Sequence, residues 1–378
     1  MSNHSSKSAQ AYNKLVDTLR EAREVYFDPK RGIVKDIDII EGYRYLLHLA
    51  SAGIDFYLEG NPEHPEFVKM VSPIRKFGGD NPDAIYHFTR IRGDRSYRIT
   101  GKRGRECYLS FTVHGRIAEE KLGLAAEPVL ADVNDRNMKI APDGSFEVIL
   151  SPEEHRGNWI QLQPTAASVI VRHYFELEKT VADDLSIEVK LKIEPLGPPS
   201  VRPPMSDDDI ARRIRDVTAF VRGGSIELID MASLPVPFVS RVPNELPQPS
   251  VFRTSGQASW GAVDIAYAMA PFLVQPDEAL IMEGRLPRCA FANVVLWNRH
   301  MQSFEFRDRR VSLNRVQMKR GRDDSYRIVI AHKDPGVPNW LDTEGHTGGS
   351  IFWRFLLPEG QMEKPKCTLV PLSEVSRK

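Results

Sequence analysis

The stretch Asp334-Pro-Gly-Val-Pro-Asn-Trp-Leu-Asp-Thr-Glu-Gly-His346 leads into the apolar run Ser350-Ile-Phe-Trp-Arg-Phe-Leu356. It places a Pro/Gly turn, an Asn-Trp pair, acidic residues and a histidine between two strand-like segments. An earlier stretch has the same order, with Gly157-Asn-Trp-Ile160 followed by Ser168-Val-Ile-Val-Arg-His-Tyr-Phe175. The chain therefore looks like an internal duplication.

The spacing of landmark residues supports two copies of one unit. Gly101 precedes Asn158 by 57 positions, and Gly284 precedes Asn339 by 55 positions. The arginine that follows each asparagine lies 14 and 15 positions further on. Slips of one or two residues are typical of loop insertions, so we expect the same fold twice.

Alternating segments predict the strands of each copy. Residues 109, 111 and 113 are apolar, whereas Ser110, Thr112 and His114 are polar, so the two sets lie on opposite faces of a strand. Aligned without a gap, segment 107–113 matches segment 289–295. Residues 146–150 and 185–193 also alternate. Short alternating strands bounded by Gly, Pro and Asn favour an antiparallel sandwich.

Two helices are predicted before the strands. Apolar residues recur at helical spacing over 8–27 and again over 36–57, which predicts an α-hairpin that ends at Gly60-Asn-Pro62. In the second helix the apolar stripe consists of Ile40, Tyr43, Leu47, Ala50, Ile54 and Tyr57. We expect this stripe to face the core or another helix, and a dimer contact is the alternative.

Proline and composition predict the domain organisation. Five prolines between residues 195 and 204 indicate a boundary. We predict a helical region (1–78), a first β-sandwich (79–197), a proline-rich linker with one helix (198–256) and a second β-sandwich (257–378). The linker helix follows Ser206-Asp-Asp-Asp209, which is interpreted as a helix cap, with a magnesium–diphosphate motif as the alternative.

The charge balance excludes some classes of protein. Lys plus Arg and Asp plus Glu both number 51 in 378 residues, so no net field attracts nucleic acid or anionic membrane. There is no apolar signal segment or membrane span, and a cytoplasmic location is expected. The three cysteines, Cys107, Cys289 and Cys367, show no disulfide or zinc spacing and are interpreted as small buried residues.

Several motifs resemble a known family. They are the Tyr-Arg-Ile-x-Gly entry at Tyr97–Gly101, the Asn-Trp pairs followed by x-Arg-x-Tyr/Phe, and the stretch 334–346. These motifs are similar to the family catalogued as domain of unknown function 1214, most strongly over 270–358 and less strongly over 80–197. The resemblance implies a jelly-roll β-sandwich, often beside a second sandwich, and implies no assigned reaction.

A cluster of His and Asp residues is the first candidate for chemistry. His332 and Asp334 are two positions apart, and Asp342 and His346 are four apart. Together they are predicted to form a catalytic acid–base pair, with turn formation by the Asp residues as the alternative. No His-x-His or His-Glu-x-x-His motif occurs, so no metal or cofactor is predicted, and a divalent metal is the weaker option.

Arginines and tryptophans are the candidates for ligand binding. Arg172 and Arg354 lie within apolar strands, where a guanidinium needs a partner. An ion pair with an acid such as Asp342, or an anion clamp, satisfies that need. Trp159, Asn339 and Trp340 are predicted to contact ligand, and plugging the end of a sandwich is the alternative. His173, on an apolar strand face, is interpreted as a core residue.

These expectations combine into a fold and a function. The fold is mainly β, with an α-helical N-terminal region and tandem antiparallel, jelly-roll-like sandwiches. The function is a small-molecule enzyme of unassigned reaction, an acid–base lyase, isomerase or hydrolase acting on an organic metabolite without a cofactor or with a metal's assistance. The alternatives are a glycan-binding or protein-binding module using Trp260, Trp297 and Trp340, and a structural assembly protein forming homo-oligomers.

Overall fold

The computed structural model describes residues 6–123, 126–184, 186–197, 201–227, 236–251 and 260–375. The helices and helical turns are α1 (Lys7–Tyr26), η1 (Pro29–Arg31), α2 (Asp36–Gly53), η2 (Ile54–Leu58), η3 (Val181–Asp183), α3 (Asp207–Gly224) and η5 (Leu372–Glu374). The strands of the first copy are β1 (Val68–Lys69), β2 (Ala84–Arg90), β3 (Tyr97–Lys102), β4 (Tyr108–Gly115), β5 (Val129–Asn134), β6 (Ser145–Ser151), β7 (Trp159–Gln161), β8 (Ala166–Tyr174) and β9 (Lys190–Pro195). Those of the second copy are β10 (Ser250–Val251), β11 (Ile265–Leu273), β12 (Glu278–Arg285), β13 (Phe291–Trp297), β14 (Ser312–Asn314), β15 (Ser325–Ala331), β16 (Trp340–Asp342), β17 (Gly348–Leu356) and β18 (Lys366–Pro371).

The strand order confirms the predicted duplication. The first copy has a five-stranded sheet, β1-β2-β8-β4-β5, and a four-stranded sheet, β7-β6-β3-β9. The second copy repeats both orders as β10-β11-β17-β13-β14 and β16-β15-β12-β18. Each pair of sheets forms a sandwich, so the fold is the predicted tandem of antiparallel β-sandwiches. The short edge strands β1 and β10 lie in segments that the sequence assigns to the helical region and the linker.

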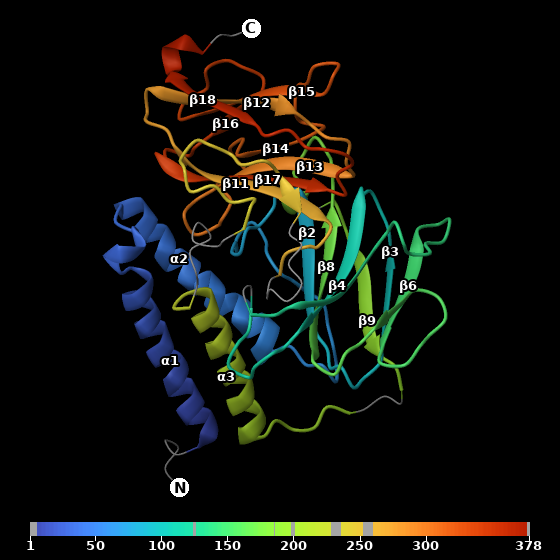
Figure 1. Cartoon of the computed structure of the whole chain (residues 1–378). Helices are drawn as coiled ribbons and strands as arrows, with labels where there is room; N and C mark the ends of the chain where they lie inside the picture. The colour runs from blue at the N-terminus through green and yellow to red at the C-terminus, as the bar shows by residue number, and fades with distance from the viewer. Residues whose placement is uncertain are drawn as a thin grey trace.

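The five-stranded sheets lie on the inside of the molecule and the four-stranded sheets on the outside (Figure 1). Each sandwich has its own apolar core between its two sheets. The opposite faces of the two five-stranded sheets are also covered, partly by each other and partly by the helices. All eight residues of β4 are buried, including the polar set Ser110, Thr112 and His114. The polar face of this strand is therefore an interior surface.

The last strand of the first copy is shorter than predicted. The alternation over 185–193 predicts one strand, but β9 starts at Lys190. Ile187 and Val189 instead pack with Ile85, Phe175 and Val181 in a small cluster beside the sandwich. Leu185 lies outside the described residues. This cluster buries the apolar residues without strand pairing. The alternation therefore predicts a longer strand than the structure contains.

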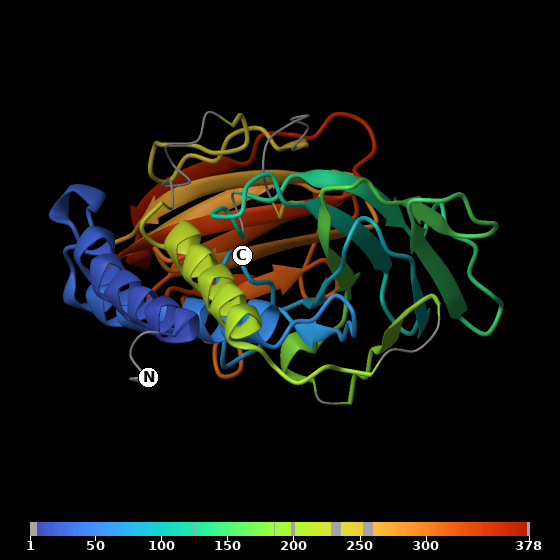
Figure 2. The ribbon, with the colours of Figure 1, turned by 90° about the horizontal axis from the view of Figure 1, so that it is seen from below.

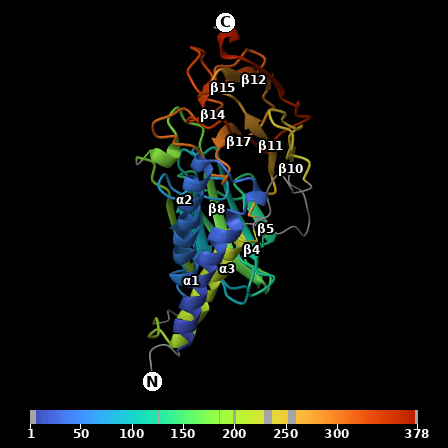
Figure 3. The same cartoon turned by 90° about the vertical axis from the view of Figure 1, so that its left-hand side faces the viewer.

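Three helices form a layer beside the first sandwich and under the second, as Figures 2 and 3 show from two other sides. α1 makes its main contact with α3 and meets α2 chiefly near their connection. The Ser206 hydroxyl accepts a hydrogen bond from the Asp209 N–H at 3.1 Å and caps α3. Asp207 accepts the N–H groups of Lys7 and Ser8 at 2.9 and 3.0 Å. The acidic run therefore caps α3 and joins it to α1, as the capping interpretation predicts.

The predicted core stripe of α2 lies largely at the surface. Ile40 is 66% exposed and Leu47 is 67% exposed, and Tyr43 and Ile54 are also exposed. The buried face of the helix instead consists of Tyr45, Leu46, Leu49, Ala52 and Phe56. Both faces carry apolar residues at helical spacing, so periodicity could not decide which one faces the core.

The two Asn-Trp pairs stabilise equivalent turns. The Asn339 amide accepts the Lys319 N–H at 2.8 Å and donates to the Lys319 and Arg327 carbonyls at 2.8 and 3.1 Å. Asn158 makes the three equivalent bonds at 2.7 to 2.9 Å. The indole N–H groups of Trp159 and Trp340 each donate to a strand carbonyl, at 3.1 and 2.9 Å. These polar groups are used within the fold.

Replacing Asn339 by Ala should destabilise the protein more than replacing Asn158 by Ala. Asn339 is only 4% exposed, so its loss leaves buried backbone groups unpaired, at about 2–3 kcal/mol. Water can replace the side chain of the partly exposed Asn158, so we expect a loss of about 1 kcal/mol there. Chemical denaturation of both variants measures the difference. Equal losses would contradict the assigned role of burial.

Candidate functional site

His346 connects the second copy to helix α2. Its Nε2 lies 3.1 Å from Glu41 Oε1, and its Nδ1 lies 3.1 Å from the Thr343 carbonyl. The ring stacks on Phe304 at 4.5 Å. Burial disfavours the imidazolium, but the hydrogen bond and charge of Glu41 outweigh burial and raise the pKa of His346. Because Glu41 also accepts a hydrogen bond from the Asn298 amide, this histidine belongs to a helix-docking contact.

The other members of the predicted acid–base cluster are held apart by separate partners. Asp342 pairs with Arg309 at 2.7 Å and accepts the Glu344 N–H at 2.8 Å. Asp334 accepts the Gly336 N–H at 2.7 Å within its turn. His332 Nε2 lies 2.9 Å from the Val274 carbonyl. The predicted His332, Asp334, Asp342 and His346 cluster therefore does not form, because turn bonds and an ion pair occupy the side chains.

Arg172 and Arg354 lie in the interior between the two copies. The predicted ion pair between Arg354 and Asp342 is wrong, because Asp342 pairs with Arg309. Arg354 donates to the Gly79 carbonyl at 2.6 Å and lies over the rings of Phe352 and Trp297 at 4.6 and 5.0 Å. Among the described residues, neither buried arginine has an ion pair with an acid.

A row of polar residues crosses the five-stranded sheet of each copy at matching register, and we call it the polar row. In the first copy it consists of Tyr86, Arg172, Ser110 and Asn134. In the second copy it consists of Tyr267, Arg354, Asn293 and Asn314. The two arginines therefore occupy equivalent places on faces that turn toward the same interior.

Each polar row binds an acid from the other copy. Asp83 precedes β2 of the first copy, and its carboxylate accepts the amides of both asparagines of the second row at 2.8 and 2.9 Å. Asp264 precedes β11 of the second copy and accepts the Asn134 amide at 3.1 Å and the Tyr108 hydroxyl. In each copy, the equivalent acid thus hydrogen-bonds to the polar row of the other copy. These reciprocal contacts fix the position of the two copies relative to each other.

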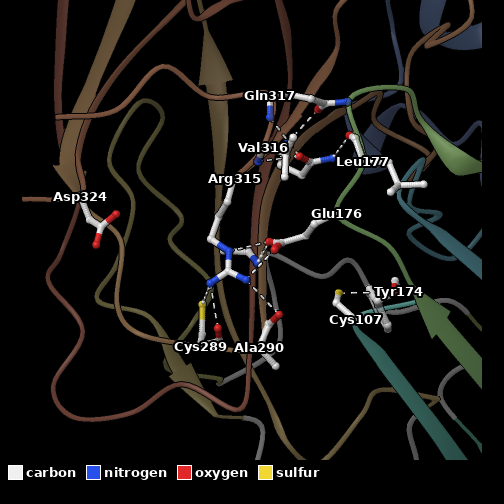
Figure 4. A network of polar contacts seen from close by, with 12 residues as sticks. Cys107, Tyr174, Glu176, Leu177, Cys289, Ala290, Arg315, Val316, Gln317 and Asp324 are labelled. Atoms are coloured by element: carbon white, nitrogen blue, oxygen red, sulfur yellow. Dashed lines mark hydrogen bonds and ion pairs between the residues drawn. The ribbon is translucent and has the colours of Figure 1, made fainter. Parts of the chain in front are cut away.

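A bidentate ion pair adds to this interface (Figure 4). Arg315 of the second copy donates to both carboxylate oxygens of Glu176 of the first copy, at 2.5 and 2.6 Å. Cys107 and Cys289 lie beside it, and burial raises the pKa of their thiols to about 12 and about 11. These cysteines are therefore poor nucleophiles, as the interpretation of them as packing residues expects.

The first polar row continues into a chain of polar contacts. Arg172 donates through Nη1 to the Thr112 hydroxyl and through Nη2 to the Trp260 carbonyl, both at 2.6 Å. The Thr112 hydroxyl donates to Asp132 at 2.6 Å. Asp264 approaches from the second copy, close enough for its charge to act on Asp132. A guanidinium, a hydroxyl and two carboxyl groups thus meet on one face of the first sheet.

Some polar atoms around this group have no hydrogen-bond partner. Among the described residues they include His114 Nε2 and one carboxylate oxygen of Asp264. Buried polar atoms are nearly always paired with protein, water or ligand. The unpaired atoms leave hydrogen-bonding positions that water or a ligand can occupy.

The buried environment shifts the pKa values of two acids, Asp132 and Glu127, and of His114. Burial, reinforced by the charge of Asp264, raises the pKa of Asp132 to about 6. Burial and the nearby Arg172 charge lower the pKa of His114 to about 3. Burial raises the pKa of Glu127 to about 7, although Trp260 donates to its carboxylate at 2.5 Å. Two carboxyl groups with pKa values near neutrality are typical of acid–base sites.

Sequence reasoning missed most of this site. It singled out Arg172 and placed Ser110, Thr112 and His114 on one face, but did not pair that face with another element. Asp132 and Asp264 carried no local signal. The polar alternation of β4 was the one sign of a buried polar face.

The described part of the chain offers no metal centre. No three His, Cys, Asp or Glu side chains gather within it in a way that could hold a metal ion. In the same residues, no helix is long and apolar enough to cross a membrane. The three cysteines are free thiols.

Replacing Asp132 by Asn should change the pH dependence of stability. The raised pKa of about 6 means that folding favours the protonated acid, so this contribution is present below about pH 4 and is lost as the pH rises through 6. D132N cannot ionise, so its free energy of unfolding relative to wild type should increase by about 2–3 kcal/mol from pH 4 to pH 7. Denaturation across this range measures the change. A constant difference would contradict the shifted pKa.

Comparisons with known proteins agree with the fold. A solved structure of an uncharacterized protein from Burkholderia cenocepacia matches with a TM-score of 0.84 at 29% identity, over 97% of this chain and 98% of that chain. The VPA0106 protein from Vibrio parahaemolyticus matches with a TM-score of 0.50 at 12% identity, over 93% and 100%, and shares the fold. No curated protein matches the chain. These comparisons assign no reaction.

One segment of the chain matches a known protein family. The matched residues, 87–176, run from β2 to just beyond β8 and include the first polar row from Ser110 to Arg172. They lie in the first copy, whereas the sequence motifs place the strongest resemblance over 270–358. The predicted resemblance is confirmed, since residues 87–176 match the family described as "Protein of unknown function (DUF1214)".

Proposed function

We propose that the chain is an acid–base enzyme for a small organic anion, with its site at Arg172, Asp132 and Asp264. The observation that carries the proposal is a pair of nearby carboxyl groups, one with a raised pKa, beside a buried guanidinium without an ion pair. The proposed site therefore lies in the interior between the copies, whereas the sequence placed it in the loop 332–346.

Arg172 is the group that would hold the substrate's anionic end. A buried guanidinium binds a carboxylate or phosphate strongly, because its own desolvation is already complete. Its present acceptors, the Thr112 hydroxyl and the Trp260 carbonyl, are neutral. An anionic ligand would therefore give Arg172 a charged acceptor in place of a neutral one.

Asp132 and Asp264 would handle the proton. Asp132, with a pKa of about 6, can accept a proton from a substrate carbon or oxygen and return it near neutral pH. Thr112 orients Asp132, since its hydroxyl lies between Arg172 and the carboxylate. Asp264 is fixed by Tyr108 and Asn134. If Asp132 removes a proton next to a carboxylate, Arg172 stabilises the negative charge that develops.

This arrangement fits lyase and isomerase chemistry, and hydrolase chemistry stays open. The proposal includes no cofactor, because the proton-transfer groups and the anion-binding group are side chains of the chain itself. A cytoplasmic location is part of the proposal, supported by the three free thiols.

Binding and proton exchange can be measured separately with a panel of small hydroxy, keto and unsaturated carboxylic acids. Calorimetry measures binding, and NMR in D2O measures exchange of the proton next to the carboxylate. We expect R172M to weaken binding at least about 10-fold through loss of the charged hydrogen bonds. D132N should retain binding and lose exchange by about 100-fold or more.

Two variants of half-exposed or exposed residues serve as controls. Arg98, on β3, pairs with acids at the surface, and Asp143 lies in an exposed turn. R98M and D143N should bind and exchange as wild type does. If no acid of the panel binds, or if D132N exchanges at the wild-type rate, the enzyme proposal fails.

An assembly role is the second candidate, and one observation favours it. Five apolar residues form an exposed stripe along α2 and η2, which we call the outer face of α2: Ile37, Ile40, Tyr43, Leu47 and Ile54. A contiguous exposed apolar stripe is typical of an interaction site. The glycan-binding alternative has less support, because Trp260 and Trp297 are buried.

Replacing Leu47 by Glu tests assembly through the outer face of α2. Leu47 is 67% exposed, so the change should leave folding intact and place a charge in any interface there. Light scattering after gel filtration should give an oligomer for wild type and a monomer for L47E. Y12E, at an exposed site on α1, is the control and should behave as wild type. A monomeric wild type would remove this candidate.

A further inference from the structure

Arg354 has a buried donor without an acceptor. The residue is only 4% exposed, and Nη2 donates to the Gly79 carbonyl at 2.6 Å. Nη1 is buried and has no hydrogen-bond partner among the described residues. An unpaired donor on a buried charge is costly, because the group has lost its water.

The equivalent arginine of the first copy shows what is missing. Arg172 Nη1 donates to the Thr112 hydroxyl at 2.6 Å. By register, Thr112 lies two residues beyond Ser110 on β4, and the matching residue two beyond Asn293 on β13 is Val295. The second copy thus has a methyl group where the first copy has the oxygen that accepts from its arginine.

The other polar groups near Arg354 supply more hydrogen-bond donors than acceptors. Tyr86 and Tyr174 share one hydrogen bond at 3.2 Å, so one of their two protons is left over. The Tyr267 hydroxyl, which lies opposite Arg354, accepts the Ala262 N–H, and no described residue accepts its proton. The charge of Arg354 acts on the hydroxyls of both Tyr174 and Tyr267.

The nearby acceptors do not balance these donors. The Asp83 carboxylate, on which the charge of Arg354 acts, already accepts the amides of Asn293 and Asn314. One acceptor, Asn293 Oδ1, is buried without a partner. A surplus of donors around a buried cation favours a bound acceptor that carries negative charge.

We propose that the interface between the two copies binds one small monovalent anion, a halide or a carboxylate of formate size, against Nη1 of Arg354. The anion accepts from Arg354 Nη1, as the Thr112 hydroxyl accepts from Arg172 Nη1 in the first copy, and compensates the buried charge. This site is separate from the Asp132 site and stands whether or not the enzyme proposal holds. Its role is to hold the second copy's polar row against the first copy.

Thermal unfolding in different sodium salts at equal ionic strength tests the anion. Relative to gluconate, which is too large to enter, chloride, bromide or formate should raise the Tm of wild type by about 2–4 °C at concentrations well above the Kd. V295T supplies a hydroxyl at the matching place and should lose most of this dependence. V294T makes the same change on the opposite face of β13, in the sandwich core, and should keep it.

Crystals soaked in sodium bromide provide a second measurement that does not depend on variant stability. We expect an anomalous peak at hydrogen-bond distance from Arg354 Nη1 in wild type and none there in V295T. A response to formate without one to bromide would identify a carboxylate site. A water molecule at this place with no bromide peak, together with equal Tm values in all salts, would overturn the proposal.

Discussion

The structure depends on the pairing of two polar sheet faces inside the molecule. Most sandwiches bury one face of each sheet and leave the other in water, but here the five-stranded sheets are covered on both faces. Polar groups on such a face must find partners or pay the cost of desolvation. The reciprocal contacts of Asp83 and Asp264 meet this requirement, because each carboxylate accepts hydrogen bonds from the other copy. The relative position of the copies therefore follows from hydrogen bonding as much as from apolar packing.

Equivalent positions around the two polar rows carry different side chains. Where the first copy has Thr112 and Asp132, the second has Val295 and Ser312 at the same register. His114 of the first copy corresponds to Trp297, whose ring stacks on Phe352 and lies under Arg354. The first copy therefore has the additional ionisable residues Asp132 and His114 on this face, and the second copy has the neutral residues Ser312 and Trp297 at those positions.

The fold was largely predictable from the sequence, and the register was not. Repeated motifs and alternating strands predicted tandem antiparallel sandwiches, because these features depend on local patterns. The ungapped alignment of 107–113 with 289–295 matched Ser110 to Ala292, whereas pairing with Arg172 and Arg354 matches Ser110 to Asn293. A shift of one residue moves every side chain to the other face of a strand. That slip hid the polar rows.

The loop 334–346 shows the opposite error, because here the sequence suggested a cluster that does not form. It concentrates ionisable residues in a short stretch, so sequence reasoning placed the chemistry there. Each of those side chains has a local or docking partner, such as Arg309 for Asp342 and Glu41 for His346. A dense local cluster was thus a sign of turn formation and helix docking.

The polar groups that do meet, in the cluster around Arg172, come from distant parts of the chain. Arg172, Thr112 and Asp132 belong to three strands of the first copy, and Asp264 and Trp260 come from the start of the second copy. No single copy therefore contains the whole cluster. The second copy closes the cluster with a carboxylate, a carbonyl and an indole ring, and at its own positions equivalent to Asp132 and His114 it has Ser312 and Trp297. If the cluster performs chemistry, the duplication is a requirement for it, because one sandwich supplies the reactive face and the other supplies its cover.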